Sequence, residues 1–332
     1  MSDPAYWDKI LGTQTGVTKV ERVSFANIMN TTSLQALVTV RHTGPDARLD
    51  VYVFNNITSA KPTELFKLSG LLKGDAKISG YSTVLTAEVD RNFGLNAGKP
   101  LDKATPDLFG EFQWNSAQGK LVQVAFPGMY PDLTRWQAED DQAAVDLGQN
   151  SWKLHALQTA RHFADQFFTK GAAVSLVSGG KIGDLHAVVT LSVPASAGGG
   201  PGPITTVSLS RLEGNPSGVW EVTSVGSKWL LIYTPTSGST ISSPVTVTGF
   251  GPQFEAQIGV VYILDYRSQP IQLGNNFAMA PDGSSPPSKF SLDVKYTSSL
   301  PGGAQEGIVE LVHTSGASFD YGVVMVKVLL NP

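Results

Sequence analysis

Apolar and polar residues alternate along short runs in the first third of the chain. In residues 33–42 the apolar positions are Leu34, Ala36, Val38 and Val40. A period of two places such side chains on one face of a half-buried strand. Residues 49–53 and 83–90 alternate in the same way, and a further strand-like run at residues 121–126 closes the region. We therefore predict a β-rich domain over residues 17–132, preceded by an N-terminal extension at residues 1–16.

After residue 132 the apolar residues recur at helical spacing. The first helical run contains Leu133, Trp136, Ala143, Ala144 and Leu147. The second run, which begins near residue 150 and ends at a glycine, contains Leu157, Ala160, Ala164, Phe167, Phe168 and Gly171. Strand-like runs follow at residues 174–177, 186–193, 204–212 and 219–225. One long helix on an antiparallel sheet predicts an α+β domain over residues 133–233.

A polar segment with proline and glycine at residues 234–239 precedes a last region of strands and turns. Strands are predicted at residues 243–249, 260–264, 290–296, 308–313 and 323–330. Short strands at this density are typical of two packed sheets. The fold class predicted for the chain is mainly β, and residues 234–332 are predicted to form a two-sheet β-sandwich domain.

Four segments of this last region carry a family pattern. They are the run SPVTVTG from Ser243, the run FEA from Phe254, the strand end Leu264-Asp265 and the run VMVKVL from Val324. In order and spacing they resemble the immunoglobulin-like domain of bacterial sporulation and spore-germination proteins. The resemblance implies that residues 234–332 form an immunoglobulin-like β-sandwich domain. The family's glycine turn after the strand-end aspartate is replaced by YRSQP at residues 266–270.

The regions before this domain are similar to modules of bacterial surface lipoproteins. The similarity is carried by NSWKL from Asn150, GVWEV from Gly218 and QVAFPGMYPDL from Gln123. The two resemblances together imply a bacterial surface lipoprotein with an extracytoplasmic location. They imply a role in binding or scaffolding, and they bring no catalytic residue.

Charge and composition exclude several kinds of partner. The formal net charge is −4, and Lys and Arg form no cluster, so we do not expect nucleic acid as a partner. The chain has no cysteine, which removes disulfides and thiolate sites. No run reaches the roughly 18 apolar residues of a membrane span. The first residues lack the pattern of a signal peptide, so we expect no export signal within this chain.

One set of residues could form a hydrolase site. Ser178 and Lys181 fit the Ser-x-x-Lys pattern, and Asp184 and His186 add the partners of a serine nucleophile. The two glycines between Ser178 and Lys181 predict a hairpin turn instead of the helical turn on which that pattern depends. The hydrolase interpretation is therefore kept as an alternative.

The other polar clusters are weaker candidates. His155 and His162 are seven residues apart, about 10.5 Å along a helix, which is too far for one metal ion without a third element. The acidic residues Glu139, Asp140 and Asp141 are consecutive, so their side chains diverge on a helix. We expect solvated faces at both places, and we predict no catalytic, cofactor-binding or metal residue.

The sequence favours a non-catalytic extracytoplasmic binding or structural protein of the bacterial cell or spore surface. Its expected partner is a cell-wall glycan or another surface protein. Two alternatives remain, a hydrolase with a site near Ser178, Asp184 and His186, and a homo-oligomeric surface protein.

Overall fold

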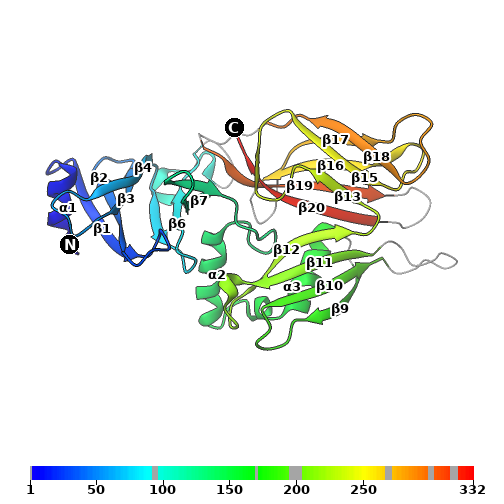
Figure 1. Ribbon diagram of the computed structural model, residues 1–332, viewed down its shortest axis with the longest axis horizontal. Coiled ribbons are helices and arrows are strands. Elements are labelled where there is room, and N and C mark those ends of the chain that lie inside the picture. The colour runs from blue at the N-terminus through cyan, green and yellow to red at the C-terminus, as the bar shows by residue number, and fades with distance from the viewer. Residues whose placement is uncertain are drawn as a thin grey trace. The chain divides into compact units, whose positions relative to one another are not determined.

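The computed structural model describes residues 2–91, 96–168, 171–193, 204–265, 271–297, 303–314 and 321–332. The altered turn at residues 266–270 lies outside these residues. The chain forms two compact units (Figure 1). Unit 1 covers residues 1–124, and unit 2 covers the remainder from residue 125, apart from residues 299–301.

Unit 1 contains two four-stranded antiparallel sheets. The first has the order β1 (Thr18–Ala26), β2 (Gln35–His42), β3 (Leu49–Asn55), β4 (Thr63–Leu71). The second has the order β5 (Asp75–Ile78), β6 (Val84–Glu88), β7 (Leu108–Asn115), β8 (Lys120–Val124), with a 3-10 turn, η2 (Leu101–Lys103), between β6 and β7. Leu37 and Val51 of the first sheet and Val84 and Leu121 of the second belong to one apolar core.

The two central strands of the first sheet in unit 1, β2 and β3, are buried on both faces. Helix α1 (Pro4–Leu11) covers the second face of this sheet and places Trp7, which is fully buried, 5.0 Å from the ring of Phe54. The alternation in β2 predicted a half-buried strand, yet Thr39 on the polar side is 1% exposed. The difference arises because the Thr39 side of β2 also carries Leu37, which packs in the core shared with the second sheet. Leu34 precedes β2 and is exposed.

Unit 2 contains a large sheet and a small sheet. The large sheet has the order β17 (Gln272–Met279), β16 (Gln257–Asp265), β19 (Gln305–Thr314), β20 (Tyr321–Leu330), β12 (Trp220–Ser227), β11 (Thr205–Arg211), β10 (His186–Ser192), β9 (Ala173–Gly179). The short β14 (Ser239–Ile241) pairs in parallel with β20. The small sheet has the order β13 (Leu231–Thr234), β15 (Val245–Gly251), β18 (Ser288–Val294).

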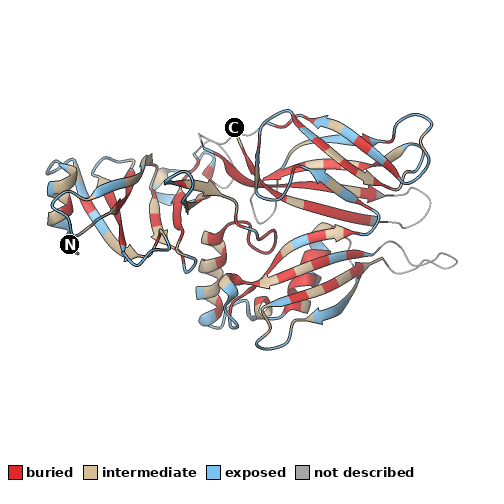
Figure 2. Ribbon diagram, in the orientation of Figure 1, coloured by how far each residue is buried: buried red, intermediate tan, exposed pale blue. Residues whose placement is uncertain are grey.

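The C-terminal part of unit 2 is an immunoglobulin-like sandwich. The small sheet packs against β16, β17, β19 and β20 around a core that includes Val247, Ile263, Phe290 and Leu311. Figure 2 shows β19 and β20 buried along almost their whole length. The pairing of Val225 with Met325 joins β12 to β20, so the sandwich sheet continues into β9–β12.

Helical segments occupy residues 135–168 of unit 2. They are α2 (Arg135–Asp146), the 3-10 turn η3 (Ser151–Leu154), α3 (Ala156–Phe163) and the π-helical turn η4 (Ala164–Phe168). Helix α3 contacts β9, β10 and β12, and η4 contacts β20. The second apolar run is thus divided between two helical geometries, where the sequence predicted one long helix. In α2 the buried face carries Ala138 and Val145, while Leu147 lies beyond the last turn and is 79% exposed.

Among the described residues, no helix combines the length and apolar character that crossing a bilayer would require.

Candidate functional site

A groove opens on the outer face of the immunoglobulin-like sheet. Strand alternation directs Ile263 of β16 and Leu311 of β19 into the sandwich core, so Tyr262 and Glu310 point outward. These two residues face each other in the register of β16 and β19, and Glu310 also faces Met325 of β20. Leu264 and Gln272 extend this strand wall.

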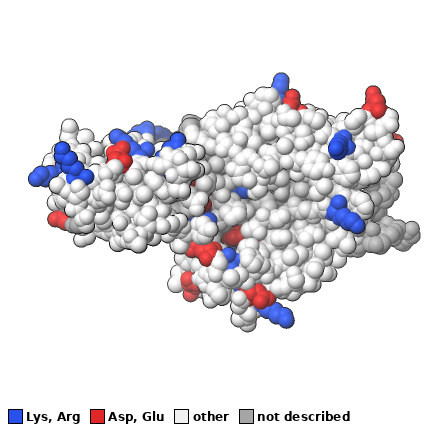
Figure 3. Space-filling model, in the orientation of Figure 1, with Lys and Arg blue, Asp and Glu red and all other residues white. Residues whose placement is uncertain are grey.

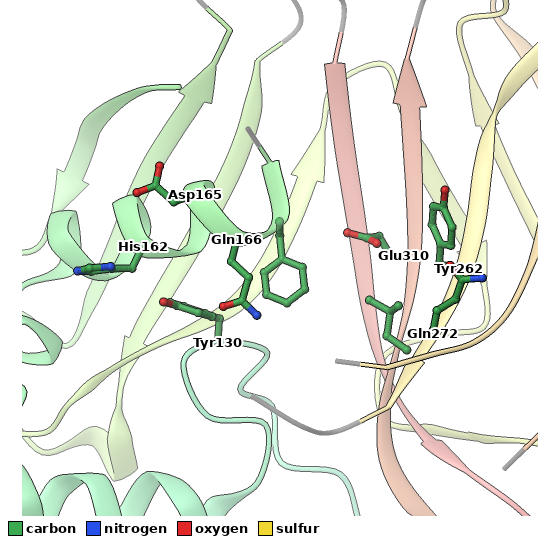
Figure 4. Close-up of a pocket in the computed structure, with 9 residues that line it drawn as sticks. Tyr130, His162, Asp165, Gln166, Tyr262, Gln272 and Glu310 are labelled. Carbon is green, nitrogen blue, oxygen red and sulfur yellow. The ribbon is translucent and has the colours of Figure 1, made fainter. Parts of the chain in front are cut away.

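The opposite wall of the groove comes from the helical segments. It consists of His162 of α3 together with Asp165, Gln166 and Phe167 of η4, and Tyr130 completes the lining. The groove has a volume of about 720 Å³. In Figure 4 the Glu310 carboxylate points from its strand toward the wall that carries Gln166.

Burial sets the protonation of two groove residues. Glu310 is 7% exposed, and desolvation raises the pKa of its carboxyl to about 7. Desolvation, together with the nearby Asp132 and Asp165, raises the pKa of Tyr130 to about 12. At neutral pH the phenol is therefore protonated, and Glu310 is poised between its neutral and charged forms.

Aromatic packing fixes the helical wall. The ring of Tyr130 lies 5.8 Å from that of Phe163 and 6.2 Å from that of Phe167, both in edge-to-face geometry. The ring of His162 lies 4.3 Å from Trp152 of η3. Aromatic pairs of this geometry contribute stabilisation beyond that of the apolar area the rings bury, so these contacts hold the helical wall in place without a ligand.

Tyr130 belongs to a buried linker, residues 126–135, that runs between the sandwich and the β9–β12 region. Lys327 of β20, 1% exposed, donates from Nζ to the carbonyls of Gly128, at 2.8 Å, and Leu133. Its Nζ also lies 3.3 Å from a carboxylate oxygen of Glu306, whose other oxygen accepts from the Phe126 amide at 2.8 Å. The linker is therefore held to the sandwich by charge-assisted bonds.

A second buried polar group holds the same linker to β12 and the helices. Lys153 of η3 pairs with Asp132, at 3.4 Å, and with Asp141 of α2. The Asp132 amide donates to Glu221 at 3.4 Å. Burial and the neighbouring Asp132 raise the pKa of Glu221 well above its ordinary value. Asp141, expected on a solvated face, instead compensates a buried lysine.

The residues of the alternative hydrolase site lie on β9, β10 and the turn between them. The Asp184 carboxylate accepts the Lys181 amide within the turn at 2.9 Å, and Nδ1 of His186 lies 3.1 Å from the Ser210 hydroxyl of β11. In the described part of the chain no hydrogen bond joins Ser178 to His186. Both Ser178 and His186 are exposed. Asp184 and His186 thus form hydrogen bonds to residues other than Ser178.

The histidines and acids named from the sequence have separate surroundings. His155 is the N-cap residue of α3, and the ring of His162 contacts that of Trp152 at an interplanar angle of 45°. Over the described ranges, no group of three or more histidine and acidic side chains is arranged to hold a metal ion. On the face shown in Figure 3, the charged side chains on the immunoglobulin-like part are scattered and form no cluster of one sign.

Sequence reasoning missed Glu310, Glu306 and Lys327 as members of the site and its support. Glu310 and Lys327 lie within predicted strands, whereas Glu306 lies in β19 two residues before the predicted start of that strand. For Glu310 and Lys327 the available signal was a charged residue within a nearly continuous apolar run, since charged residues are seldom fully buried unless paired. Lys327 in its run VMVKVL shows this signal most clearly.

Residues 230–318 match the model of the immunoglobulin-like domain of bacterial spore germination. The chain thus carries this domain in its C-terminal part. No curated protein and no solved structure matches the chain.

Proposed function

We propose that this protein is a non-catalytic extracytoplasmic binding or structural protein of the bacterial cell or spore surface, and that it holds its ligand in the groove beside Glu310. The germination-type domain at residues 230–318 supports the location and the general role. The single observation that carries the binding role is the groove, which combines two tyrosines, two amides and two carboxyl groups on walls of different elements.

We also propose that the chain is a surface lipoprotein with three domains. An N-terminal segment at residues 1–16 is followed by a β-rich domain at 17–132, an α+β domain at 133–233 and the immunoglobulin-like domain at 234–332. The helical run on β9–β12 supports an α+β domain as a module of its own. The groove lies where this module meets the sandwich, and meeting places of modules are frequent ligand sites.

A cell-wall glycan is the proposed partner, with another surface protein as the second choice. Aromatic rings provide flat apolar surfaces for the faces of sugar rings, and amide and carboxyl groups bind their hydroxyls. Tyr262 is half-buried and Gln272 is exposed, so both are accessible on the strand wall.

Retention of the protein on purified cell walls tests this function. We expect the intact chain to sediment with cell-wall glycan and the variants Tyr262→Ala and Gln272→Ala to be retained about tenfold less, a loss of about 1.4 kcal/mol in binding. Tyr233→Ala is the matched control, because Tyr233 is 48% exposed on β13 of the other sheet. Absence of retention, combined with turnover of a hydrolase substrate that Ser178→Ala removes, would contradict the proposal and favour the enzyme.

A further inference from the structure

Glu310 is a buried acid without a protein partner. No hydrogen bond or ion pair links its carboxylate to any residue that the structure describes, and more than nine-tenths of the residue is buried. Removing a carboxylate from water without compensation is unfavourable. Glu306, on the same strand, shows the usual arrangement, since its carboxylate is paired with Lys327 and accepts an amide.

The charge of the remaining lining favours a cation. Among the described residues that line the groove there is neither Lys nor Arg, and the second acidic residue among them is Asp165. An anionic ligand would therefore meet two carboxyl groups without a compensating positive charge. A positive ligand would supply the partner that Glu310 lacks.

The shape and the rings of the groove favour an organic cation over a metal ion. Phe167 of η4 and Tyr262 of β16 provide aromatic surface from opposite walls of the groove, and Figure 4 shows Tyr262 beside Glu310. Aromatic faces attract ammonium groups, including quaternary ones. A metal ion would need several oxygen or nitrogen ligands, and no suitable group of histidine and acidic residues was found over the described residues.

We infer that the groove binds an organic ammonium ion, with its positive charge against the Glu310 carboxylate and its alkyl or sugar body against Phe167 and Tyr262. The inference rests on the proposed binding function and names the ligand class of that same site. The volume of about 720 Å³ accommodates a small molecule that bears such a group.

Choline and its uncharged isostere 3,3-dimethylbutan-1-ol test the role of the charge. The two differ in charge and hardly in shape, and choline stays positive at every pH. By titration calorimetry on the full chain at about pH 8, above the pKa of Glu310, we expect choline to bind at least about tenfold more tightly than the alcohol.

Glu310→Gln keeps the shape of the side chain and removes its charge, so we expect it to abolish the preference for choline. Glu255→Gln, an exposed position of the same domain outside the groove, is the matched control and should leave the preference unchanged. A circular dichroism spectrum like that of the parent chain shows that each variant is folded.

The pH profile gives a second readout. Choline affinity should increase as Glu310 ionises through about pH 7 and then become constant. The other groups facing Glu310 are Tyr262 and Met325 in the sheet register and Tyr130, His162 and Asp165 among the groove-lining residues. His162→Gln removes the one imidazole of this set, so an unchanged profile in this variant assigns the titration to Glu310.

The source of the ammonium group is decided by comparing glucosamine oligomers with their N-acetylated forms. Tighter binding of the free amine places the ammonium group on a glycan, and binding of choline alone places it on a free small molecule. Equal affinity for choline and the alcohol, or a choline preference that survives Glu310→Gln, would overturn the inference. Retention on cell walls would then still decide the proposed binding function by itself.

Discussion

The Glu310 carboxyl couples the stability of unit 2 to pH. Its pKa is raised from an ordinary value of 4.5 to about 7 because burial disfavours the charged form. Between these two values the unfolded chain loses the proton while the folded chain keeps it. Stability is therefore lost as the pH rises from about 4.5 to 7, and the loss is complete above the folded-state pKa.

Glu310→Gln should remove this loss. A change from 4.5 to about 7 corresponds to about 3 kcal/mol, since one pKa unit is worth about 1.4 kcal/mol. We expect the variant to gain stability relative to the parent chain between about pH 5 and pH 8, by up to about 3 kcal/mol. Denaturant unfolding at both pH values measures the difference, with Glu255→Gln as the exposed control. A difference that does not change with pH would show that the carboxyl is not buried as described.

The sequence predicts the strand that holds Glu310 but not the environment of this residue. The apolar run at residues 308–313 correctly indicates a strand. Whether an outward side chain meets water or protein depends on what covers that face, and here the cover includes η4, whose residues lie more than a hundred positions earlier. Periodicity reports only neighbours along the chain, so this contact could not be predicted from it.

At the scale of elements, the linker at residues 126–135 organises unit 2. A segment without regular structure carries backbone groups that need partners when it is buried. Lys327 donates to two carbonyls of the linker, and Glu306 accepts from one of its amides. The Met129 amide donates to the Val222 carbonyl of β12. The charged side chains are thus partners for a buried backbone as well as for each other.

Lys327→Met should destabilise unit 2 strongly. The substitution removes the donor to Gly128 and Leu133 and leaves the Glu306 carboxylate buried without its cation. Breaking one half of a buried ion pair costs about 3–5 kcal/mol, which denaturant unfolding can measure.

The double variant Lys327→Met with Glu306→Gln separates the charge from the carbonyl bonds. Because the amide of glutamine carries no charge and its oxygen can still accept from Phe126, the double variant should recover part of the lost stability. Lys228→Met, at an exposed lysine, is the control. Equal stability of the parent chain and Lys327→Met would contradict the role of this lysine.

Element type was more predictable than element surroundings in unit 1 as well. The alternation in β2 predicted a strand correctly, because side chains alternate between the faces of any strand. It predicted one solvated face wrongly, because that face carries Leu37 and packs in the core shared with the second sheet. In the helical run the apolar stripe at Ala160 and Ala164 was informative, but the change from α to π geometry after Phe163 has no counterpart in the spacing of apolar residues.

At the scale of the whole molecule, the large sheet of unit 2 extends beyond the immunoglobulin-like sandwich. Strand β20 pairs with β19 on one side and meets β12 on the other, at Val225 and Met325. Its outward residues Met325 and Lys327 are 4% and 1% exposed. Strand order across such distances cannot be derived from local patterns, because the β12–β20 pairing joins segments about a hundred residues apart.

Fragments of the chain test this dependence. We expect residues 125–332 to fold as unit 2, with native-like near-ultraviolet circular dichroism and an intact groove. Residues 230–332 retain the sandwich core but lose the linker, the helical segments and β12, so the outward side chains of β19 and β20 become exposed. Each buried aliphatic side chain returned to water costs about 1.5–3 kcal/mol, so the shorter fragment should be less stable by about 3 kcal/mol or more.

Two measurements distinguish the possible results. Thermal unfolding compares the stability of the two fragments, and choline titration asks whether the strand wall can bind without Gln166 and Phe167 of the helical wall. We expect the shorter fragment to melt earlier and to bind choline at least about tenfold more weakly. Equal stability and equal affinity would mean that the sandwich is self-sufficient and that Glu310 needs only its own sheet. The linker and the helical segments would then contribute nothing to the site, and the two-walled groove would have to be abandoned as the binding unit.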